Sequence, residues 1–548
     1  MPRTCWAIEL GTTNSLAARW VGTHAETVRL DSICSVDPTW NTPLIPTVVC
    51  LQDENRGYIG AQALVADEVL RATYAGRLTP LARCFKKVLA RDSRQAVAEI
   101  DGQAVSARQC ATVFLRGIVS EIGECEGLLG DAAIPQWNLV RRVFAWLRRK
   151  GPISDLTMTA PIESFEAYRM ELQGIARKLG TTQVRIIDEP VAAALGYGID
   201  LTDDRNLFVV DFGGGTLDLA IVRTTLAQSP GARSRAPGHR KAEVIAARGL
   251  EIGGETIDDW ISDLACRELT AHADRLRPII RSQAEAVKKE LSGKVLASDY
   301  ALFTLPGGES VELPRQRFLD ELSARGLYTI LDTITDAVLA DARHRLSAAD
   351  LDAVLLVGGS TLLPGVRDHF ERRFGAERVH YWKPFEAVVE GAAIYGAGYH
   401  VDQIIHHDYA IRVFNERANA PQYELLIKRG TAYPTTQGFE TRYYKVAPRQ
   451  QLFSLPVCEV GLAGRLALKW DRQTNGQFYW QPEGTEEQDC VMVLNEGDAV
   501  RLNPPGSGDK ARLRVDFTID NERWLCATVH DLLRGKDLRS NDRVSRLR

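Results

Sequence analysis

The chain has 548 residues, of which 45% are hydrophobic and 25% charged, a balance typical of folded soluble proteins. With 67 Lys and Arg against 71 Asp and Glu, the net charge is −4, which argues against a dedicated nucleic-acid-binding protein. No apolar run reaches the roughly 18 residues that span a bilayer, and no signal-peptide core precedes the first strand-like segment. The ten cysteines form no C-x-x-C pair, so we expect reduced thiols in a cytoplasmic protein.

Up to about residue 400, short β-rich runs alternate with long segments of helical periodicity, which indicates α/β layers around a substantial parallel sheet. Strands are expected at Cys5–Leu10, Thr47–Leu51, Leu156–Thr159, Val184–Ile187, Leu207–Val210, Leu217–Val222, Glu243–Ala247 and Ala353–Val357. Helices are expected at Ser164–Leu179, Pro190–Tyr197, Glu255–Ala273, Ile280–Ser292 and Arg315–Leu346.

After about residue 405 the pattern changes to short strands separated by Gly, Pro, Asn or Asp turns, as in a β-sandwich or barrel. Strands are expected at Tyr409–Phe414, Tyr423–Lys428, Gln451–Val460, Arg465–Trp470, Phe478–Trp480, Cys490–Leu494, Leu513–Ile519 and Trp524–Val529. The predicted domains are an α/β domain over 1–399, a linker over 400–411, a β-sandwich over 412–538 and a basic tail over 539–548. A basic amphipathic segment, Asn138–Lys150, is either a solvated face or a docking element.

Two segments resemble each other: AIELGTTNS at Ala7–Ser15 and VVDFGGGTLDLAIV at Val209–Val222. Each places an acidic residue at the end of an apolar strand and then a Gly turn with hydroxyl residues. Glycine lets backbone N–H groups approach a phosphate, and Glu9 and Asp211 stand where carboxylates could hold Mg²⁺ or its waters. The duplication predicts two hairpins that grip one triphosphate from opposite sides.

Two further Gly turns occur, LLVGGSTLLP at Leu355–Pro364 and LEIGGETID at Leu250–Asp258. A single Gly-rich turn is more often only a turn. Four of them, each after a strand or before a helix, favour a phosphate-binding site.

The ordered series IELGTTNS, IPTVV, FKKVLAR, RIIDEPVAAALGYG, VVDFGGGTLDLAIV, IGGETID, AEAVKKELS, LLVGGSTLLP and EAVVEGAA resembles the nucleotide-binding domain of the 70-kDa heat-shock (DnaK-like) chaperone family. That domain has the duplicated, two-lobed actin-like fold. LLIKRGTAYPT and LRVDFTIDNERWLCATVHDLLRGK resemble the family's peptide-binding β-sandwich. The resemblance implies ATP or ADP and Mg²⁺, with K⁺ as a further candidate ion, and a partner that is extended or unfolded peptide or a dedicated protein.

The resemblance also implies roles for individual residues. Lys86 matches a lysine that orients the attacking water, and Glu189 matches a glutamate near the metal's water shell. Asp211, Asp218 and Thr216 match residues around the metal and the attacking water, with Glu9 as the second metal candidate. The predicted nucleotide-binding residues are Gly11, Thr12, Thr13, Asn14, Gly213, Gly214, Gly215, Gly253, Gly254, Glu285, Lys288, Lys289, Ser292, Gly358, Gly359 and Ser360.

Each assignment has a simpler alternative. Lys86 could be an ordinary surface lysine, and Asp218 could only cap a turn. Lys288 and Lys289 could lie on a solvated helix face. His406 and His407 are expected to be solvated linker residues, because no Cys/His spacing accompanies them.

The sequence departs from the family at several places. Glu9 stands where the family has Asp, and the extra methylene moves the carboxylate by about 1.5 Å, which catalytic geometry tolerates poorly. Leu362 replaces an Arg near adenine, and Phe385 precedes Glu386 where the family has Asp, so we expect a more apolar adenine side. Only Ile404 and Ile405 of the linker could insert between the lobes, which puts domain coupling and J-domain or nucleotide-exchange partners in question.

Only twelve residues follow Lys536, where the family continues into a helical lid, so a lidless member with fast peptide exchange is expected. The favoured function is a chaperone-like ATPase with slow hydrolysis. The alternative is a nucleotide-dependent switch or scaffold that does not hydrolyse ATP and docks one protein partner. A third reading, an actin-fold sugar kinase, is disfavoured by the C-terminal sandwich.

Overall fold

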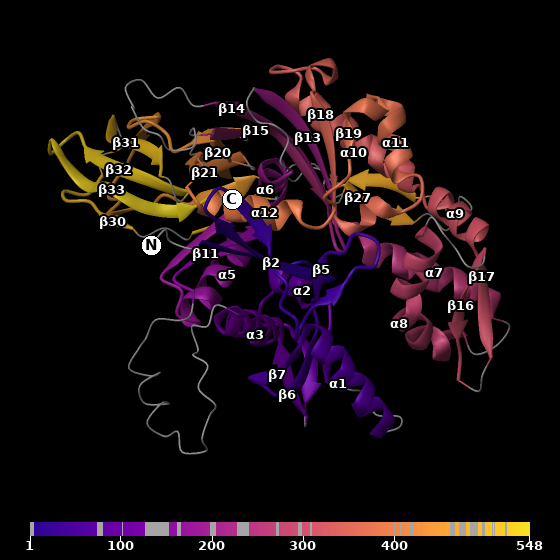
Figure 1. The fold of residues 1–548 in the computed structure, drawn as a ribbon. Coiled ribbons are helices and arrows are strands. Elements are labelled where there is room, and N and C mark those ends of the chain that lie inside the picture. Colours follow the sequence, from indigo (N-terminus) through magenta and orange to yellow (C-terminus); the bar gives the residue numbers. More distant parts are fainter. Residues whose placement is uncertain are drawn as a thin grey trace. The chain divides into compact units, whose positions relative to one another are not determined.

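The structure is a computed structural model, shown as a ribbon in Figure 1. It divides into two compact units, Met1–Val401 and Asp402–Arg548, and each is described by itself. The structure describes residues 5–73, 80–100, 102–125, 153–161, 166–197, 204–226, 240–269, 273–293, 299–306, 309–398, 400–405, 408–415, 420–428, 430–460, 466–470, 478–482, 491–495, 499–506, 508, 510–520 and 523–547.

The first half of the N-terminal unit is built on a mixed sheet. Strand β1 (Trp6–Glu9) pairs antiparallel with β2 (Asn14–Val21) and parallel with β11 (Asp155–Ala160). Strand β12 (Gln183–Asp188) continues the parallel order on β11. On the other side β2 pairs with β3 (His24–Thr27) and β5 (Pro43–Pro46), and β5 pairs with β4 (Ser35–Val36). Every residue of β11 is buried, as expected of a strand covered on both faces.

The second half repeats this strand plan. Strand β13 (Arg205–Phe212) pairs antiparallel with β14 (Leu217–Leu226) and parallel with β18 (Ala353–Val357). Strand β19 (Val379–His380) continues the parallel order, and β15 (Arg240–Leu250) pairs antiparallel with β14. Each sheet is therefore a hairpin followed by two parallel strands. The duplication that the sequence shows in two short motifs is a duplication of whole sheets.

Further elements of this unit surround the two sheets. The helices are α1 (Gly60–Thr73), α2 (Phe85–Arg91), α3 (Ala107–Cys125), α5 (Glu166–Lys178), α6 (Glu189–Gly196), α7 (Gly254–Glu268), α8 (Ala273–Ser292), α9 (Arg315–Ala324), α10 (Leu327–Ala342), α11 (Val366–Phe374) and α12 (Ala387–Gly396), with 3₁₀ turns η1 (Ala348–Asp350), η2 (Gly359–Leu362) and η3 (Ala376–Arg378). The smaller strands are β6 (Val49–Asp53), β7 (Arg56–Ile59), β8 (Leu81–Ala82), β9 (Ala96–Ile100), β10 (Gln103–Ser106), β16 (Tyr300–Thr304) and β17 (Ser310–Pro314).

One expected helix is wrong as a single element. Arg315–Leu346 is divided into α9 and α10 at Gly326, whose φ of 73° lies in the left-handed region that favours glycine. The apolar periodicity continues on both sides of this residue, so the pattern alone does not show the break.

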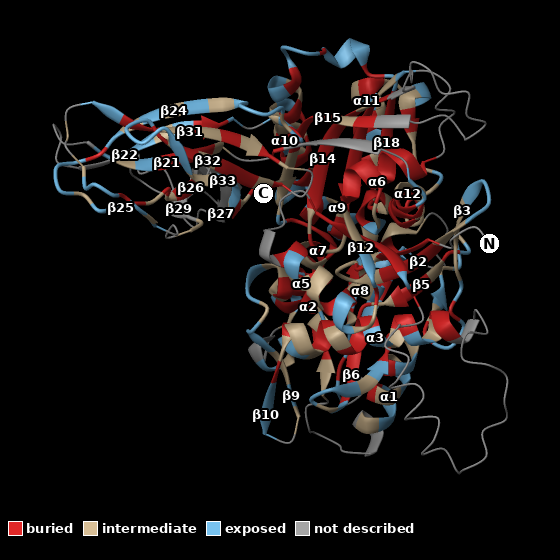
Figure 2. Ribbon diagram, turned by 90° about the vertical axis from the view of Figure 1, so that its left-hand side faces the viewer, coloured by how far each residue is buried: buried red, intermediate tan, exposed pale blue. Residues whose placement is uncertain are grey.

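Helices α6 and α12 link the two halves. Helix α6 follows β12 of the first sheet but packs on β13 and β14 of the second, whereas α12 packs on β1, β2 and β11. Figure 2 shows both helices as largely buried. Their backbones touch, because a Cβ atom at Gly196 would lie 1.8 Å from the carbonyl oxygen of Ala387, and one at Gly391 would lie 1.7 Å from that of Ala192. Only glycine permits this close crossing.

The C-terminal unit consists mostly of β-strands, and no helix follows Gly396 in the described part of the chain. One antiparallel sheet has the order β22 (Ala420–Ile427), β21 (Asp408–Asn415), β26 (Val457–Val460) and β29 (Val491–Val493). A second has the order β24 (Glu440–Lys445), β31 (Ala511–Ile519), β32 (Trp524–Asp531) and β33 (Lys536–Arg546). Both contribute to one apolar core, and the remaining strands are β20 (His400–Ile404), β23 (Ala432–Tyr433), β25 (Leu452–Phe453), β27 (Leu466–Trp470), β28 (Phe478–Pro482) and β30 (Val500–Arg501).

Two details of the C-terminal unit differ from what the sequence suggested. Residues 539–546 are not a basic tail, because they belong to β33, which pairs with β32. Leu547, which follows this strand, is fully buried. Ile405, one of the two linker residues thought free to insert between lobes, is fully buried in the core of this unit. His406, His407 and Asn138–Lys150 lie outside the described residues.

Two of the opening expectations concern properties of the whole chain. No helix among the described residues is long and apolar enough to cross a membrane. The described cysteines that carry free thiols are Cys5, Cys34, Cys50, Cys84, Cys110, Cys266, Cys458 and Cys526.

Candidate functional site

The two duplicated turns face each other at the ends of the central hairpins. A Cβ atom at Gly214 would lie 2.3 Å from Thr13 Oγ1, and one at Gly215 would lie 2.7 Å from Thr12 Oγ1. The hydroxyl groups of the first turn therefore lie against the bare backbone of the second. This is the opposition of turns that the sequence predicts.

Internal hydrogen bonds hold the shape of each turn. The backbone N–H of Gly11 donates to Ser15 Oγ at 3.2 Å, and Asn14 then begins β2. In the second turn the N–H of Gly213 donates to the carbonyl oxygen of Thr216 at 2.9 Å, directly before β14. Both turns are thus short and anchored at their strand ends.

The start of α7 is joined to the second turn. The N–H groups of Gly254 and Glu255 donate to the carbonyl oxygens of Gly213 at 3.0 Å and Gly214 at 2.8 Å. A Cβ atom at Gly253 would lie only 2.4 Å from the Gly214 carbonyl oxygen. The glycines of the IGGETID motif therefore allow the start of α7 to approach the turn at Gly213–Gly215 closely.

The GGS turn lies against the same place. Ser360 Oγ donates to the carbonyl oxygen of Gly213 at 2.7 Å. Gly358 has a φ of 84°, and a Cβ atom there would lie 2.3 Å from the Phe212 carbonyl oxygen and 2.9 Å from Asp211 Oδ1. Gly359 lies beside the Phe385 ring, with 3.2 Å between a Cβ atom built there and Cε1. The predicted apolar residue Phe385 thus borders the turn.

Lys86 forms a buried ion pair on the first half's side of the site. Its Nζ lies 3.0 Å from Oε1 of Glu189, and the two side chains are 9% and 6% exposed. Thr159 Oγ1 also donates to this oxygen at 3.4 Å. Burial by itself lowers the pKa of Lys86, but the charge and hydrogen bond of Glu189, together with Tyr168 and Glu9, outweigh burial and hold that pKa above its usual value. Lys86 is therefore a cation at neutral pH and not a surface lysine.

The nearby carboxyl groups of Glu9 and Asp211 have raised pKa values, which disfavour their charged forms. Burial, together with the charges of Glu189 and Asp211, raises the pKa of Glu9 well above its usual range, and Glu9 Oε2 is buried without a hydrogen-bond partner. Burial and the charge of Glu189 raise the pKa of Asp211 to about 7. Asp218, which is 1% exposed, lies opposite Asp211 in the β13–β14 register. These acids would be stabilised by additional positive charge.

A divalent cation fits that requirement. In the part of the chain that the structure describes, no group of three or more His, Cys, Asp or Glu side chains is arranged to hold a metal directly. The partnerless oxygen of Glu9 and the raised pKa of Asp211 instead suit Mg²⁺, which is held through few carboxylates and several waters.

Helix α8 brings its predicted residues toward the start of α7. Lys288 Nζ lies 2.9 Å from Asp258 Oδ1 and donates to the carbonyl oxygen of Gly254 at 2.9 Å. Lys289 is 62% exposed and pairs with Glu285 at 2.6 Å. Although burial raises the pKa of Glu285, the charges of Lys289 and Lys288 outweigh it and hold that pKa low. Ser292 Oγ is buried without a hydrogen-bond partner, so it can still bind a ligand.

The family model for the Hsp70 protein matches residues 149–411. Over these residues, just under half of the chain, the sequence is similar to the Hsp70 family. Members of this family bind nucleotide and are ATPases of the chaperone class. The matched segment includes Glu189, Asp211, the glycine turns at 213–215, 253–254 and 358–360, and helix α8. The similarity therefore agrees with the phosphate-type geometry of the glycine turns.

The matched segment also contains functional candidates that sequence reasoning missed. Tyr168 on α5 is fully buried, and its hydroxyl has no hydrogen-bond partner. Burial raises its pKa despite the opposing charge of Lys86, so it is a neutral phenol beside Lys86 and Glu189. The next residue, Arg169, forms a buried ion pair with Asp188. The DEP tripeptide hints at Asp188, whereas no sequence signal marks Tyr168.

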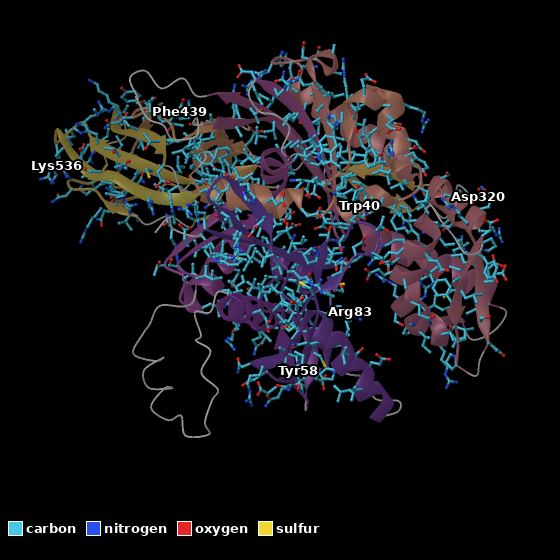
Figure 3. All side chains as sticks on the ribbon, in the orientation of Figure 1. Trp40, Tyr58, Arg83, Asp320, Phe439 and Lys536 are labelled. Atoms are coloured by element: carbon cyan, nitrogen blue, oxygen red, sulfur yellow. The ribbon has the colours of Figure 1, made fainter. Side chains whose placement is uncertain are left out.

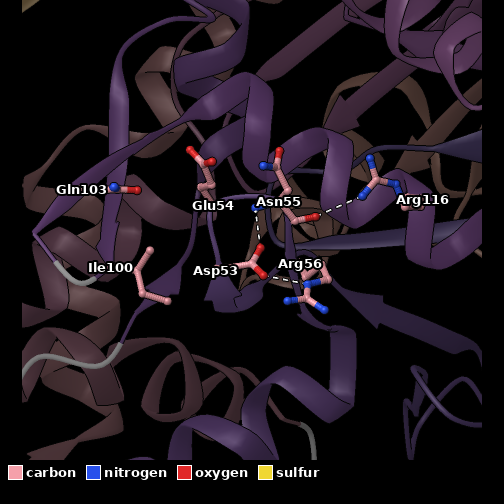
Figure 4. A pocket seen from close by; sticks show the side chains of 7 residues that line it. All are labelled: Asp53, Glu54, Asn55, Arg56, Ile100, Gln103 and Arg116. Atoms are coloured by element: carbon pink, nitrogen blue, oxygen red, sulfur yellow. Dashed lines mark hydrogen bonds and ion pairs between the residues drawn. The ribbon is translucent and has the colours of Figure 1, made fainter.

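A separate cavity of about 540 Å³ lies in the first half of the N-terminal unit, around the turn between β6 and β7 (Figure 4). Arg116 reaches it from α3 and donates to the Asn55 carbonyl oxygen at 3.0 Å. Its lining residues are Asp53, Glu54, Asn55, Arg56, Ile100, Gln103 and Arg116. None of these is a predicted nucleotide residue, so the cavity is not part of the candidate site.

Proposed function

We propose that the chain is a chaperone-like ATPase with an actin-type, two-lobed domain over residues 1–399. This domain binds and hydrolyses ATP, and the C-terminal β unit binds extended peptide or a protein partner. The observation that carries the proposal is the contact of the Thr12–Thr13 turn with the Gly214–Gly215 turn beside the Lys86–Glu189 pair. Two opposed amide-rich turns next to a buried cation form a site for a polyphosphate.

The chain's own residues supply most of what phosphoryl transfer to water requires. The transition state spreads charge over the phosphoryl oxygens, and catalysis consists mainly of positioning and charge stabilisation. Amides of the two turns and the ammonium group of Lys86 would stabilise that charge. Glu189, Asp211 and Asp218 would orient the attacking water and accept its proton, with the Thr216 hydroxyl alongside.

Mg²⁺ would be held by Asp211 and Glu9 through water, and when bound it would neutralise phosphate charge. The carboxylates fit this role because burial and the charge of Glu189 raise the pKa values of both groups. K⁺ remains a second candidate ion. The nucleoside would lie between α8, with Lys288 and the free Ser292 hydroxyl, and the GGS turn at Gly358.

The β unit offers an apolar face for peptide. In the β21–β22 register Arg412 pairs with Tyr423 and Phe414 with Pro421, so Phe414, Tyr423 and Leu425 lie on one face. They are 63%, 44% and 43% exposed. Strand β22 is at the edge of its sheet, where an extended peptide can add backbone contacts while its side chains meet this face.

The alternative is a switch that binds ATP without hydrolysis and docks a dedicated partner. Two observations favour it: the longer Glu9 carboxylate at the metal side, and Ile405, which is held in the core of the β unit rather than free for insertion between lobes.

Single-turnover ATP hydrolysis by the full chain, at defined Mg²⁺ and K⁺, with and without an apolar peptide, separates the two functions. The ATPase predicts turnover that requires Mg²⁺ and changes with peptide. Tight ATP binding with no turnover under any of these conditions would establish the switch instead. If turnover occurs but peptide does not change its rate, the chain is an ATPase whose hydrolysis is not coupled to peptide binding.

A further inference from the structure

Three turns gather at one end of the C-terminal unit: residues 445–452, the described residues of 501–512 (501–506, 508 and 510–512) and 531–536. Backbone hydrogen bonds join them, from Leu532 N–H to the Arg512 carbonyl oxygen at 2.8 Å and from Leu502 N–H to that of Gln451 at 2.7 Å. Lys536, at the start of β33, lies at the outer end of the unit in Figure 3. These three turns are called the leucine tip below.

The leucine tip exposes large apolar side chains that do not belong to the core of the unit. Leu533 is 63% exposed, Leu452 is 56% exposed and Leu532 is 43% exposed. The alternate residues of β31 and β32 that point inward are buried in the core, so the burial needed for folding is met elsewhere. Three exposed leucines on two of these joined turns are available for contact with a partner.

Basic residues surround these leucines. The described parts of the three turns carry six exposed basic residues, Lys445, Arg449, Arg501, Lys510, Arg534 and Lys536. Arg512 and Asp531 add no net charge, because both are buried and Asp531 accepts two hydrogen bonds from Arg512 at 3.2 and 2.9 Å. The tip is therefore strongly positive.

The same ion pair makes the turn rigid. Asp531 Oδ1 accepts the N–H of Leu533 at 3.0 Å, and its carbonyl oxygen accepts those of Arg534 at 3.1 Å and Gly535 at 2.8 Å. Gly535 has a φ of 61°, which closes the turn. Leu532 and Leu533 are presented on a preorganised support, so little ordering is required when they contact a surface.

We propose that the leucine tip docks on an anionic lipid bilayer. The leucines would enter the boundary between headgroups and acyl chains, and the surrounding Lys and Arg would face anionic headgroups, the pairing of apolar and basic residues that peripheral membrane sites use. A bilayer fits better than a protein groove because the exposed leucines lie on two separate turns at the end of the unit, with exposed basic residues on all three turns.

Co-sedimentation of the full chain with vesicles tests this. Binding is expected to vesicles of phosphatidylcholine and phosphatidylserine, weakly to phosphatidylcholine alone, and to fall with added salt. Leu532→Ser/Leu533→Ser should reduce the binding by about tenfold. Phe439→Ser, a change at an exposed apolar residue of the same unit that lies outside the three turns and is 39% exposed, should not.

Thermal unfolding of both variants checks that they fold, and ATP binding, which belongs to the other unit, should be unchanged in both. Equal vesicle binding by the double variant and the native chain would overturn the proposal, as would equal binding to neutral and anionic vesicles. Capture of an acidic peptide by the tip without vesicle binding would also overturn it, in favour of a protein partner. If the native chain does not bind ATP, the proposed function is wrong, whereas the proposal for the leucine tip is unaffected.

Discussion

The β1–β2 half and the β13–β14 half of the N-terminal unit share a strand plan but supply different chemistry. The first half contributes Lys86, Glu189 and the hydroxyls of its turn, whereas the second contributes bare glycine backbone and a pair of aspartates. A duplicated scaffold places two turns opposite each other, and the first half then supplies the lysine and the hydroxyl groups whereas the second supplies glycine backbone and aspartates. The comparison shows that the shared fold sets where the two turns lie, whereas the side chains of each half determine which chemical groups reach the site.

The largest effect is expected when the charged half loses its cation. Lys86→Ala should lower single-turnover hydrolysis by about 10²–10³-fold, because a fixed positive charge at the phosphate is lost. It should also destabilise the fold by about 3–5 kcal/mol, since Glu189 is left buried without its partner.

Lys86→Ala/Glu189→Gln separates these two effects, and it should recover stability but not turnover. Lys87→Ala, at the neighbouring half-buried lysine, is the matched control and should retain activity. Full hydrolysis by Lys86→Ala would remove Lys86 from the site.

The amide-bearing half is tested at the contact between turns. Gly214→Ala places a methyl group 2.3 Å from Thr13 Oγ1, so the turns must separate, and ATP affinity should fall by about tenfold or more. Thr13→Ala removes the clashing hydroxyl and should rescue much of that loss in the double variant. Titration of ATP in a double-mutant cycle measures the coupling, and strictly additive effects would contradict the contact.

The acids that border both halves predict a pH dependence of stability without ligand. The pKa of Asp211 is about 7 in the fold, against about 3.9 in an unfolded chain, so between these values the folded state holds more protons. Raising the pH through this window should therefore lower the melting temperature of the nucleotide-free protein, and Glu9 acts in the same direction.

Asp211→Asn should be more stable than the native chain above pH 7 and no different near pH 4, with a gain of about 2–4 °C for each kcal/mol. Thermal melts across this range measure it. A parallel pH dependence in the two proteins would show that Asp211 is not the group responsible.

The smallest effect concerns Tyr168, which only the first half provides. Because its hydroxyl is buried without a partner, Tyr168→Phe should keep or raise stability by about 1 kcal/mol. If the hydroxyl contacts the reacting water or phosphate, hydrolysis should nevertheless slow, by less than Lys86→Ala. Melting temperature and single-turnover rate together show whether the Tyr168 hydroxyl acts in hydrolysis. An unchanged rate would mean that Tyr168 contributes to packing alone.

Several features of this protein could be predicted because they are local. The alternation of an apolar strand, an acid and a glycine turn identifies both hairpins, since only glycine permits the close approaches seen at Gly214 and Gly358. The order of motifs also led to the Hsp70 family, whose model matches residues 149–411. The break at Gly326 escaped prediction because apolar periodicity continues through it.

Other features depend on distant segments and have no local signal. Arg-rich residues 539–546 read as a tail, yet they form β33 because β32 offers an unpaired edge. Ile405 resembles a free linker residue until the sheets of the C-terminal unit enclose it. Tyr168 lies on an ordinary amphipathic helix, and only packing brings it beside Lys86 and Glu189.

The sequence by itself determined the strand ends, the glycine turns and the kinds of groups that could meet a phosphate, because backbone freedom and side-chain chemistry are properties of single residues. The tertiary structure decided which of these groups are buried together. Burial and neighbouring charge turn Lys86 into a persistent cation and Asp211 into a carboxyl group that titrates near neutral pH. The same is true of the leucine tip, where the Arg512–Asp531 pair holds a turn whose exposed side chains the sequence alone does not distinguish from a core.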